Sequence, residues 1–258
     1  MITAVVDVDV TSFIAVCEAS KEALKTATLL RSLKLNALIQ GEKGVGKKTL
    51  CSYILPNASQ ISAKNHEELL SLLHSEQELI VTDFENVANI KVIIDTATKN
   101  GVRLIATASV NYTHELLEEF FTIRFTIPPL SQRKEDVFPL VDKFLTEFET
   151  LIGHKASFEL KDFEPDLSEN AYSLKKQILI ASIFDEIEEK EIMQLMYDFL
   201  YAKLGTNNDY KNFLHLYEAP LIKAGLKRFK SQLQLADKLG LNRNTLRKKI
   251  SENKEYLV

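Results

Sequence analysis

Short apolar runs and helically spaced apolar residues alternate along the N-terminal half of the chain. Each run is brief and ends in turn-forming or charged residues, which favours a buried strand over a helix. The predicted strands are 37–39, 79–81, 102–106 and 121–127, and the predicted helices are 49–55, 67–74 and 92–99. Strands that alternate with helices in this way predict an α/β fold, with a mostly parallel sheet covered by helices.

Only helices are expected after this region. One helix is predicted up to Phe148, and residues 165–183 are expected to complete a small helical lid. Residues 186–204 are amphipathic and acidic, and the turn-forming run 205–208 predicts a linker. We therefore divide the chain into an α/β core at 1–135, a helical lid with a linker helix at 136–204, and an all-α domain at 205–258.

Composition restricts the class of protein. Of the 258 residues, 45% are hydrophobic and 26% are charged, which is typical of globular chains and excludes wholesale disorder. No apolar run approaches the ~18 residues of a membrane span, and the acidic N-terminus does not resemble a signal peptide. Cys17 and Cys51 cannot form a disulfide framework, and the histidines lack metal-ligand spacing. We expect a cytoplasmic protein with no membrane partner and no structural metal.

The net charge of −4 hides an uneven distribution. Residues 221–258 contain ten Lys and Arg but three acidic residues, which gives a formal charge of +7 and leaves −11 for residues 1–220. An asymmetry of this kind often marks a nucleic-acid-binding module. A solvated charged helix is the alternative interpretation.

Three helices are predicted in the C-terminal region. The first covers 210–229. Ser231 is a suitable N-cap for a short second helix, and Gly240 can end that helix in the left-handed conformation. Asn242 can cap a third helix, whose buried face includes Leu246. A short helix, a glycine turn and a basic helix form a helix-turn-helix, whose second helix enters the major groove.

The exposed face of the third helix carries the candidate DNA contacts. Arg can read guanine through two hydrogen bonds, Asn can read adenine, and a basic flank meets phosphates. The candidates are Asn242, Arg243, Asn244, Thr245, Arg247, Lys248 and Lys249. Double-stranded DNA is therefore the expected partner.

A phosphate-binding loop is predicted between the first strand and the next helix. Gly41-Glu-Lys-Gly-Val-Gly-Lys47 matches the Walker A pattern, in which backbone N–H groups and the lysine hold phosphates. The candidate nucleotide-binding residues are Gly41, Gly44, Val45, Gly46, Lys47, Lys48 and Thr49, with Asp83 and Glu85 as the remnant of a Walker B site. ATP or ADP is the candidate ligand and magnesium a candidate cofactor, but Lys48 stands where a magnesium-binding Ser or Thr is expected.

The run from Ser231 to Ile250 closely resembles the Fis-type helix-turn-helix, and the resemblance extends over 207–253. The upstream segment 217–224 resembles the helix through which those domains dimerise. The resemblance implies a homodimer formed by the C-terminal module. It also implies that the positions matching Asn242, Arg243, Thr245, Arg247, Lys248 and Lys249 lie at the DNA.

A second resemblance covers the rest of the chain. Ile127-Pro-Pro-Leu-Ser-Gln-Arg-Lys-Glu-Asp-Val137 resembles the motif that joins core to lid in the AAA+ domain of NtrC-type, sigma-54-dependent enhancer-binding proteins. The segments 41–47 and 102–106 match the same family. The resemblance implies a P-loop AAA+ core with a parallel sheet and a small helical lid, followed by the helix-turn-helix domain.

Several functional positions of that family are changed in this sequence. The stretch 50–82 is too short to include the GAFTGA loop that grips sigma-54. Phe84 stands at the catalytic Glu position, Ser109 at the sensor Asn position and Tyr172 at the sensor Arg position. The stretch 112–121 lacks arginine fingers, whose loss typically costs ~10³–10⁵ in rate.

The sequence therefore predicts a DNA-binding transcription regulator related to NtrC-type activators, without sigma-54 activation and with weak or absent ATP hydrolysis. One alternative is an active AAA+ ATPase that remodels RNA polymerase holoenzyme. Another is an inhibitory partner that co-assembles with a full-length activator.

Overall fold

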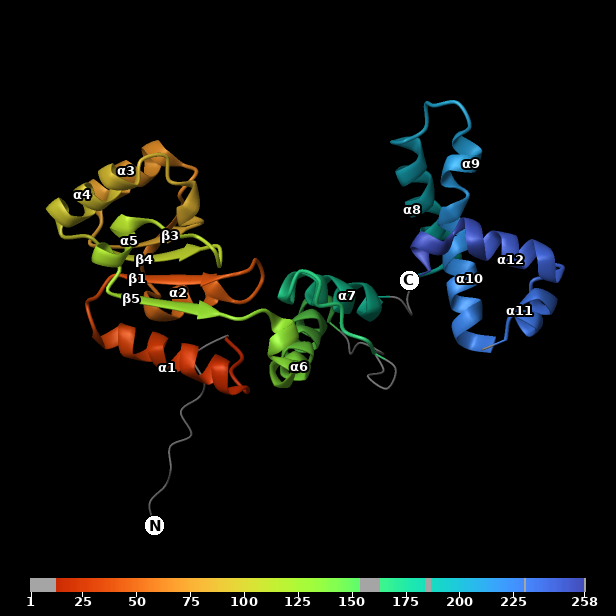
Figure 1. The fold of residues 1–258 in the computed structure, drawn as a ribbon, viewed down its shortest axis with the longest axis horizontal. Coiled ribbons are helices and arrows are strands. Elements are labelled where there is room, and N and C mark those ends of the chain that lie inside the picture. The colour runs from red at the N-terminus through yellow and green to blue at the C-terminus, as the bar shows by residue number, and fades with distance from the viewer. Residues whose placement is uncertain (1–12, 154–162, 184–186, 230, 258) are drawn as a thin grey trace, which may run out of the picture. The chain divides into compact units, whose positions relative to one another are not determined.

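The computed structural model describes residues 13–153, 163–183, 187–229 and 231–257 (Figure 1). The acidic N-terminal segment, His154 and Lys230 lie outside these ranges. The chain divides between residues 186 and 187 into two compact units. The predicted division at 135/136 and 204/205 separates functional regions and stays a prediction.

A five-stranded parallel sheet forms the centre of the first unit. Its strands are β1 Ala37–Gly41, β2 Ser59–Ser62, β3 Glu78–Thr82, β4 Arg103–Ala108 and β5 Ile123–Ile127. They lie in the order β2-β3-β4-β1-β5, and every neighbouring pair is parallel. The predicted parallel α/β sheet is thus confirmed. Because β1 lies between β4 and β5, the loop that follows β1 opens at a point where the strand order reverses, which is where ligands bind in such sheets.

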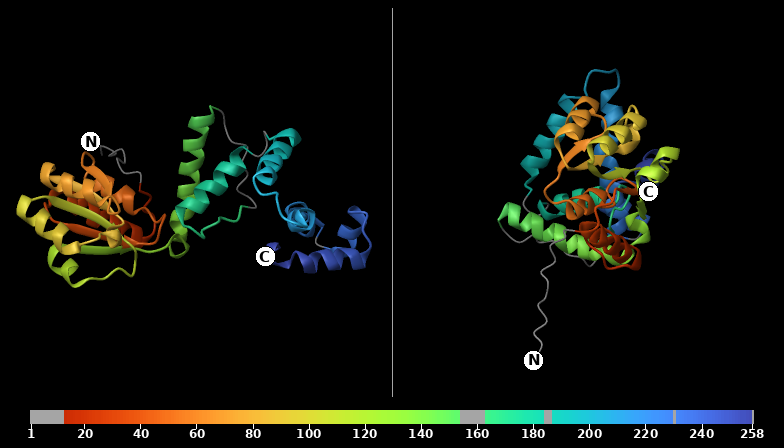
Figure 2. Two further views of the ribbon diagram at one scale, coloured as in Figure 1. Left: turned by 90° about the horizontal axis from the view of Figure 1, so that it is seen from above. Right: turned by 90° about the vertical axis from the view of Figure 1, so that its left-hand side faces the viewer.

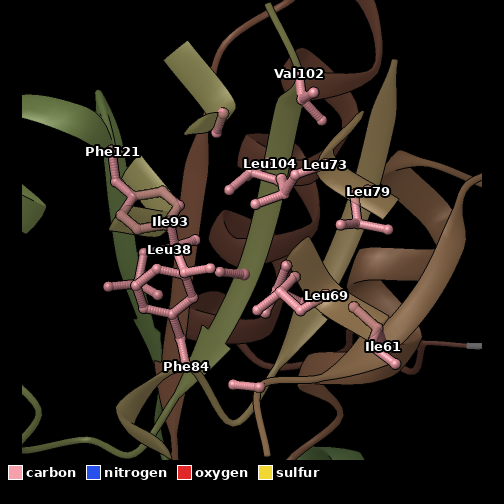
Figure 3. Close-up of a cluster of buried hydrophobic side chains, with 14 of the residues drawn as sticks. Leu38, Ile61, Leu69, Leu73, Leu79, Phe84, Ile93, Val102, Leu104 and Phe121 are labelled. Carbon is pink, nitrogen blue, oxygen red and sulfur yellow. The ribbon is translucent and has the colours of Figure 1, made fainter. Parts of the chain in front are cut away.

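Five helices cover the two faces of the sheet (Figures 1 and 2). They are α1 Glu18–Ser32, α2 Lys47–Ile54, α3 His66–Ser75, α4 Ile90–Asn100 and α5 Glu115–Phe120. Alternate residues of a strand point to opposite faces, so Leu38 packs with α3, α4 and α5, while Ala37 and Ile39 pack with α1 and α2. Figure 3 shows the cluster under α3 and α4, where Leu69, Leu73 and Ile93 meet the sheet.

Three elements of this unit, α1, β2 and α5, were not predicted from the sequence. The helix α1 buries mainly small residues, such as Ala23 and Ala27, so its apolar stripe is weak. The edge strand β2 buries one large apolar side chain, Ile61, and reads as a polar segment. The short α5 has only six residues and buries Leu117 alone, so it shows no helical periodicity. The predicted strand at 121–127 begins only at Ile123, because Phe121 ends α5 and packs edge-on against Phe84, with 5.3 Å between ring centroids.

Two helices form the lid of the first unit. They are α6 Lys134–Ile152 and α7 Ala171–Ile183. Val141, Phe144 and Phe148 of α6 pack against Leu174 and Ile178 of α7. The predicted helical lid is confirmed, although α7 begins at residue 171 and not near 165.

The second unit contains only helices. They are α8 Glu189–Tyr201, α9 Asp209–Phe213, α10 His215–Phe229, α11 Gln232–Lys238 and α12 Arg243–Glu252, followed by a short 3-10 helix at Lys254–Tyr256. The prediction of one helix over 210–229 is corrected, because α9 and α10 are separated at Leu214. Leu214 keeps helical backbone angles, so the interruption between the two helices is a single residue.

The helix-turn-helix forms as its local signals predict. The Ser231 side chain accepts a hydrogen bond from the Gln234 backbone, and Asn242 accepts one from the Thr245 backbone at 2.8 Å. Gly240 is left-handed, with φ 63°. A small core of Ile222, Leu235, Ala236 and Leu246 joins α10, α11 and α12. Within the described ranges, no helix has the length and apolarity needed to cross a membrane.

Candidate nucleotide site and DNA-binding surface

The loop after β1 contains left-handed glycines and is contacted closely by two other segments of the chain. Gly44 and Gly46 have φ values of 82° and 104°, which residues with a Cβ rarely adopt. A Cβ on Gly46 would lie 2.7 Å from the Phe13 ring, and one on Gly44 would lie 2.5 Å from the Glu169 carbonyl oxygen. The segment before α1 and the segment before α7 therefore both lie directly against this loop.

A cavity of about 730 Å³ opens beside the loop, at the carboxyl ends of β1, β3 and β4. Most of the predicted nucleotide-binding residues line it together: Gly41, Gly44, Gly46, Lys47, Lys48, Thr49, Asp83 and Glu85. Ser109 and Tyr172, which stand where the resembling family has its sensor residues, line it as well. Val45 does not, because its side chain is buried beneath the loop in the hydrophobic core.

Lys47 lies inside its own loop. Its ammonium group donates hydrogen bonds to the carbonyl oxygens of Gly41 and Glu42, the latter at 2.8 Å. Burial lowers the pKa of Lys47, and the negative charges of Glu85 and then Asp83 oppose that shift. The lysine and the two carboxylates therefore share one electrostatic environment at the end of β3.

The residues after β3 divide between the core and the cavity. Phe84 is fully buried against Phe121, so the position that carries the catalytic Glu in the resembling family faces the hydrophobic core. Glu85 lines the cavity instead, and its Oε2 atom is buried without a hydrogen-bond partner among the described residues. Asp83 is left-handed, with φ 56°, and its backbone N–H donates to the Thr107 hydroxyl at 3.2 Å.

A buried ion pair joins the loop to the lid. Arg133 and Asp136 are 3.2 Å apart and are almost fully buried. Arg133 also donates to the carbonyl oxygen of Val45, at 3.0 Å, and Asp136 accepts from the backbone N–H groups of Val16 and Cys17. Both residues lie in the motif at 127–137, but the sequence did not indicate that their partners are the P-loop and the segment before α1.

Asn170 fastens the lid to the loop. It is buried and left-handed, with φ 56°, immediately before α7. Its amide nitrogen donates to the Glu42 carboxylate and to the Lys43 carbonyl, each at 3.0 Å, and its oxygen accepts from the Leu130 backbone at 2.6 Å. No local sequence signal pointed to this residue.

In the part of the chain that the structure describes, no three His, Cys, Asp or Glu side chains come together as a metal site. Asp83 and Glu85 are the carboxylates at the end of β3.

The recognition helix α12 presents most of the predicted DNA contacts to solvent. Asn242, Arg243, Asn244, Arg247 and Lys248 are exposed, and Thr245 is half-buried. Five basic or amide side chains on one exposed surface suit the binding of phosphates and base edges.

Lys249 is placed differently from its neighbours. Its ammonium group pairs with the Glu218 carboxylate of α10, and the two side chains are only 28% and 14% exposed. The Asn253 amide lies 3.5 Å from the same carboxylate. Glu218 thus holds α12 against α10, and the sequence analysis did not identify it.

Comparisons with known proteins support this description of the fold. The sequence pattern of bacterial regulatory proteins of the Fis family matches residues 213–252. The structure is similar to NtrX from Brucella abortus in complex with ADP, with 14% identity and a TM-score of 0.54, over 93% of this chain and 69% of that one. NtrX in complex with ATP gives 14% identity and a TM-score of 0.55, over 95% and 70%. No curated protein matches the sequence. The first unit is a parallel α/β core with a helical lid, similar in fold to NtrX, and the second unit contains a helix-turn-helix that the Fis-family pattern matches, as predicted.

Proposed function

We propose that this protein is a sequence-specific, DNA-binding transcription regulator related to NtrC-type activators. The observation that carries the proposal is the exposed basic surface of α12, on a helix whose back is fixed by Leu246 and by the Lys249–Glu218 pair. Arg243 lies in the first turn of α12, which is the part of a recognition helix that reaches base edges.

The direct test is a mobility-shift assay of the full chain against fragmented genomic DNA at low salt. A saturable shift with a subset of fragments is expected, and sequencing of that subset would give the operator. Lys91→Ala, on the exposed surface of α4, is a matched control that should bind like the wild type. Failure to shift any fragment would overturn the proposal.

We further propose that the second unit forms a homodimer on an inverted-repeat site. The helix α8 has no buried residue in the single chain, and Met193 and Leu195 are 71% and 64% exposed. Tyr210 and Tyr217 are also exposed on the neighbouring helices. Apolar side chains in such a group are typical of an interface. Leu195→Glu should shift the protein to a monomer in sedimentation analysis, whereas Glu189→Gln on the same helix should not.

The cavity in the first unit is proposed to bind ATP or ADP with weak or absent hydrolysis. Lys47 and the left-handed glycines support nucleotide binding. Hydrolysis needs groups that neutralise charge in the transition state, and none of the residues that line the cavity in the described chain is an arginine. We also propose that the protein does not remodel the sigma-54 holoenzyme, because the stretch 50–82 is occupied by the rest of α2, by β2, α3 and β3, and by short connections.

An active AAA+ ATPase that remodels RNA polymerase holoenzyme is the second candidate. The observation in its favour is that Lys47, Asp83 and Glu85 line one cavity. Multiple-turnover ATP hydrolysis that disappears in Lys47→Ala would support this candidate against the first. Co-purification with a full-length activator would instead support the inhibitory partner.

A further inference from the structure

The cavity beside the P-loop contains an excess of positive side chains. Its lining includes Lys43, Lys47, Lys48, Lys64 and Lys175 against Glu42, Asp83 and Glu85.

Some of these charged side chains are already paired within the protein. Lys175 lies 2.7 Å from Glu147, and Glu42 accepts a hydrogen bond from Asn170. Lys48 and Lys64 are exposed, and among the described residues neither ammonium group has a hydrogen-bond or ion-pair partner.

Magnesium fits this lining poorly. The ion requires oxygen ligands in near-octahedral geometry, and at a P-loop one of them is the hydroxyl of the residue after the lysine. Lys48 occupies that position, and an ammonium group has three donors and no acceptor. Thr49 offers the next hydroxyl, but one residue along a helix is about 100° around its axis. A cation at the usual position would therefore lose a ligand and meet a positive charge.

The carboxylates at the end of β3 lie near a positive charge of the protein itself, that of Lys47. Glu85 and Asp83 are the groups whose charges most strongly favour the protonated form of Lys47. They are thus placed to keep Lys47 charged while it lies in a partly buried loop. Lys47 thus offsets part of their negative charge, while the Glu85 Oε2 atom has no hydrogen-bond partner among the described residues.

We propose that this cavity binds the phosphate chain of a nucleoside di- or triphosphate without a divalent cation, and that the ammonium groups of Lys48 and Lys64 supply the neutralising charge. The inference rests on the proposed nucleotide binding. Lysine binds phosphate as a compact point charge, and two lysines carry the same charge as one magnesium ion. Without a metal to polarise the outer phosphate, the bound nucleotide acts as a ligand that stabilises the core and lid.

The test is a titration of the full chain with fluorescent methylanthraniloyl-ADP, in magnesium chloride and in EDTA. Wild-type affinity is expected to be at least as high in EDTA. Lys48→Thr should bind about tenfold more weakly in EDTA and recover when magnesium is added. Lys25→Thr, on the exposed surface of α1, is the matched control and should behave like the wild type in both buffers.

The possible results separate the two proposals. Wild-type binding that requires magnesium would overturn this inference and leave nucleotide binding intact. No binding in either buffer would overturn both. Equal affinities of Lys48→Thr and the wild type in EDTA would show that Lys48 does not supply the charge. An independent readout is the electron paramagnetic resonance of manganese, which should show no protein-bound ion with wild type and ADP, and a bound ion with Lys48→Thr and ADP.

Discussion

The P-loop and the recognition helix both carry a clear sequence motif, but they differ in how the rest of the protein contacts them. The P-loop is held by Arg133 through the Val45 carbonyl, by Asn170, and by the ring of Phe13. In α12, by contrast, Arg243 and Arg247 are exposed and form no ion pair with the described residues. The conformation of the P-loop therefore depends on contacts with residues far away in the sequence. The exposed side chains of α12, in contrast, are available to a ligand without such contacts.

The largest effect is expected from Asp136→Ala. It would leave the Arg133 guanidinium buried without its charge partner and would remove the acceptor of two backbone N–H groups. Breaking a buried ion pair from one side typically costs about 3–5 kcal/mol. Thermal unfolding of the first unit should shift accordingly and nucleotide binding should weaken, while DNA affinity is retained. Asp142→Ala, at an exposed position of α6, should change neither. Equal stability of the two variants would contradict the role of the pair.

Gly225→Ala is the corresponding change in the second unit, and it should affect DNA binding and not nucleotide binding. A Cβ at this position would overlap the buried Leu235 side chain, which would have to move and would disturb the packing of α10 on α11. Overpacking of this kind costs about 1–3 kcal/mol, and DNA affinity should fall while nucleotide binding is retained. The double variant with Leu235→Ala should recover part of the loss, which a double-mutant cycle would measure. Additive losses would exclude this contact as the cause.

Arg243→Ala is expected to relax sequence preference without loss of fold. Removing one bidentate reader should cost about 1–3 kcal/mol of discrimination at one base pair. Lys248→Ala is the matched comparison, because this exposed side chain lies five residues farther along α12 and would meet phosphate. It should weaken binding on all sequences and reduce the salt slope by about 1. Binding measurements on the operator and on point-substituted operators, at several salt concentrations, distinguish the two. Identical profiles would contradict the separate roles.

The smallest effect under ordinary conditions is expected at Cys51. Burial raises the pKa of this thiol to about 12, from an ordinary value of 9.0. The unfolded chain therefore loses the proton before the folded chain does, and the free energy of unfolding falls as pH rises above 9.0, by at most about 1.4 kcal/mol per pH unit. Denaturant unfolding in the alkaline range should show this decline, and Cys51→Ala should flatten it. Below that range the two proteins should have parallel pH profiles.

Local patterns were sufficient for much of the fold. The apolar runs at 37–39, 79–81 and 102–106 predicted three strands of the sheet, since a buried parallel strand needs apolar residues on both faces. The caps Ser231 and Asn242 were equally readable, because a capping side chain bonds to a backbone group only three residues away. The glycine spacing at 41–46 is likewise a local pattern, and it predicted the loop that follows β1.

Only the tertiary structure decided the rest. It placed Phe84 in the core and left Glu85 at the cavity, paired Lys249 with Glu218, and brought Asn170 to the P-loop. These contacts join residues 31 to 128 positions apart in the chain, and no local pattern encodes such a partner. The sequence by itself determined which chemical groups each unit carries. The packing determined which of those groups are available to a ligand. A buried polar group is paired inside the protein, whereas an exposed one is available to bind DNA or phosphate.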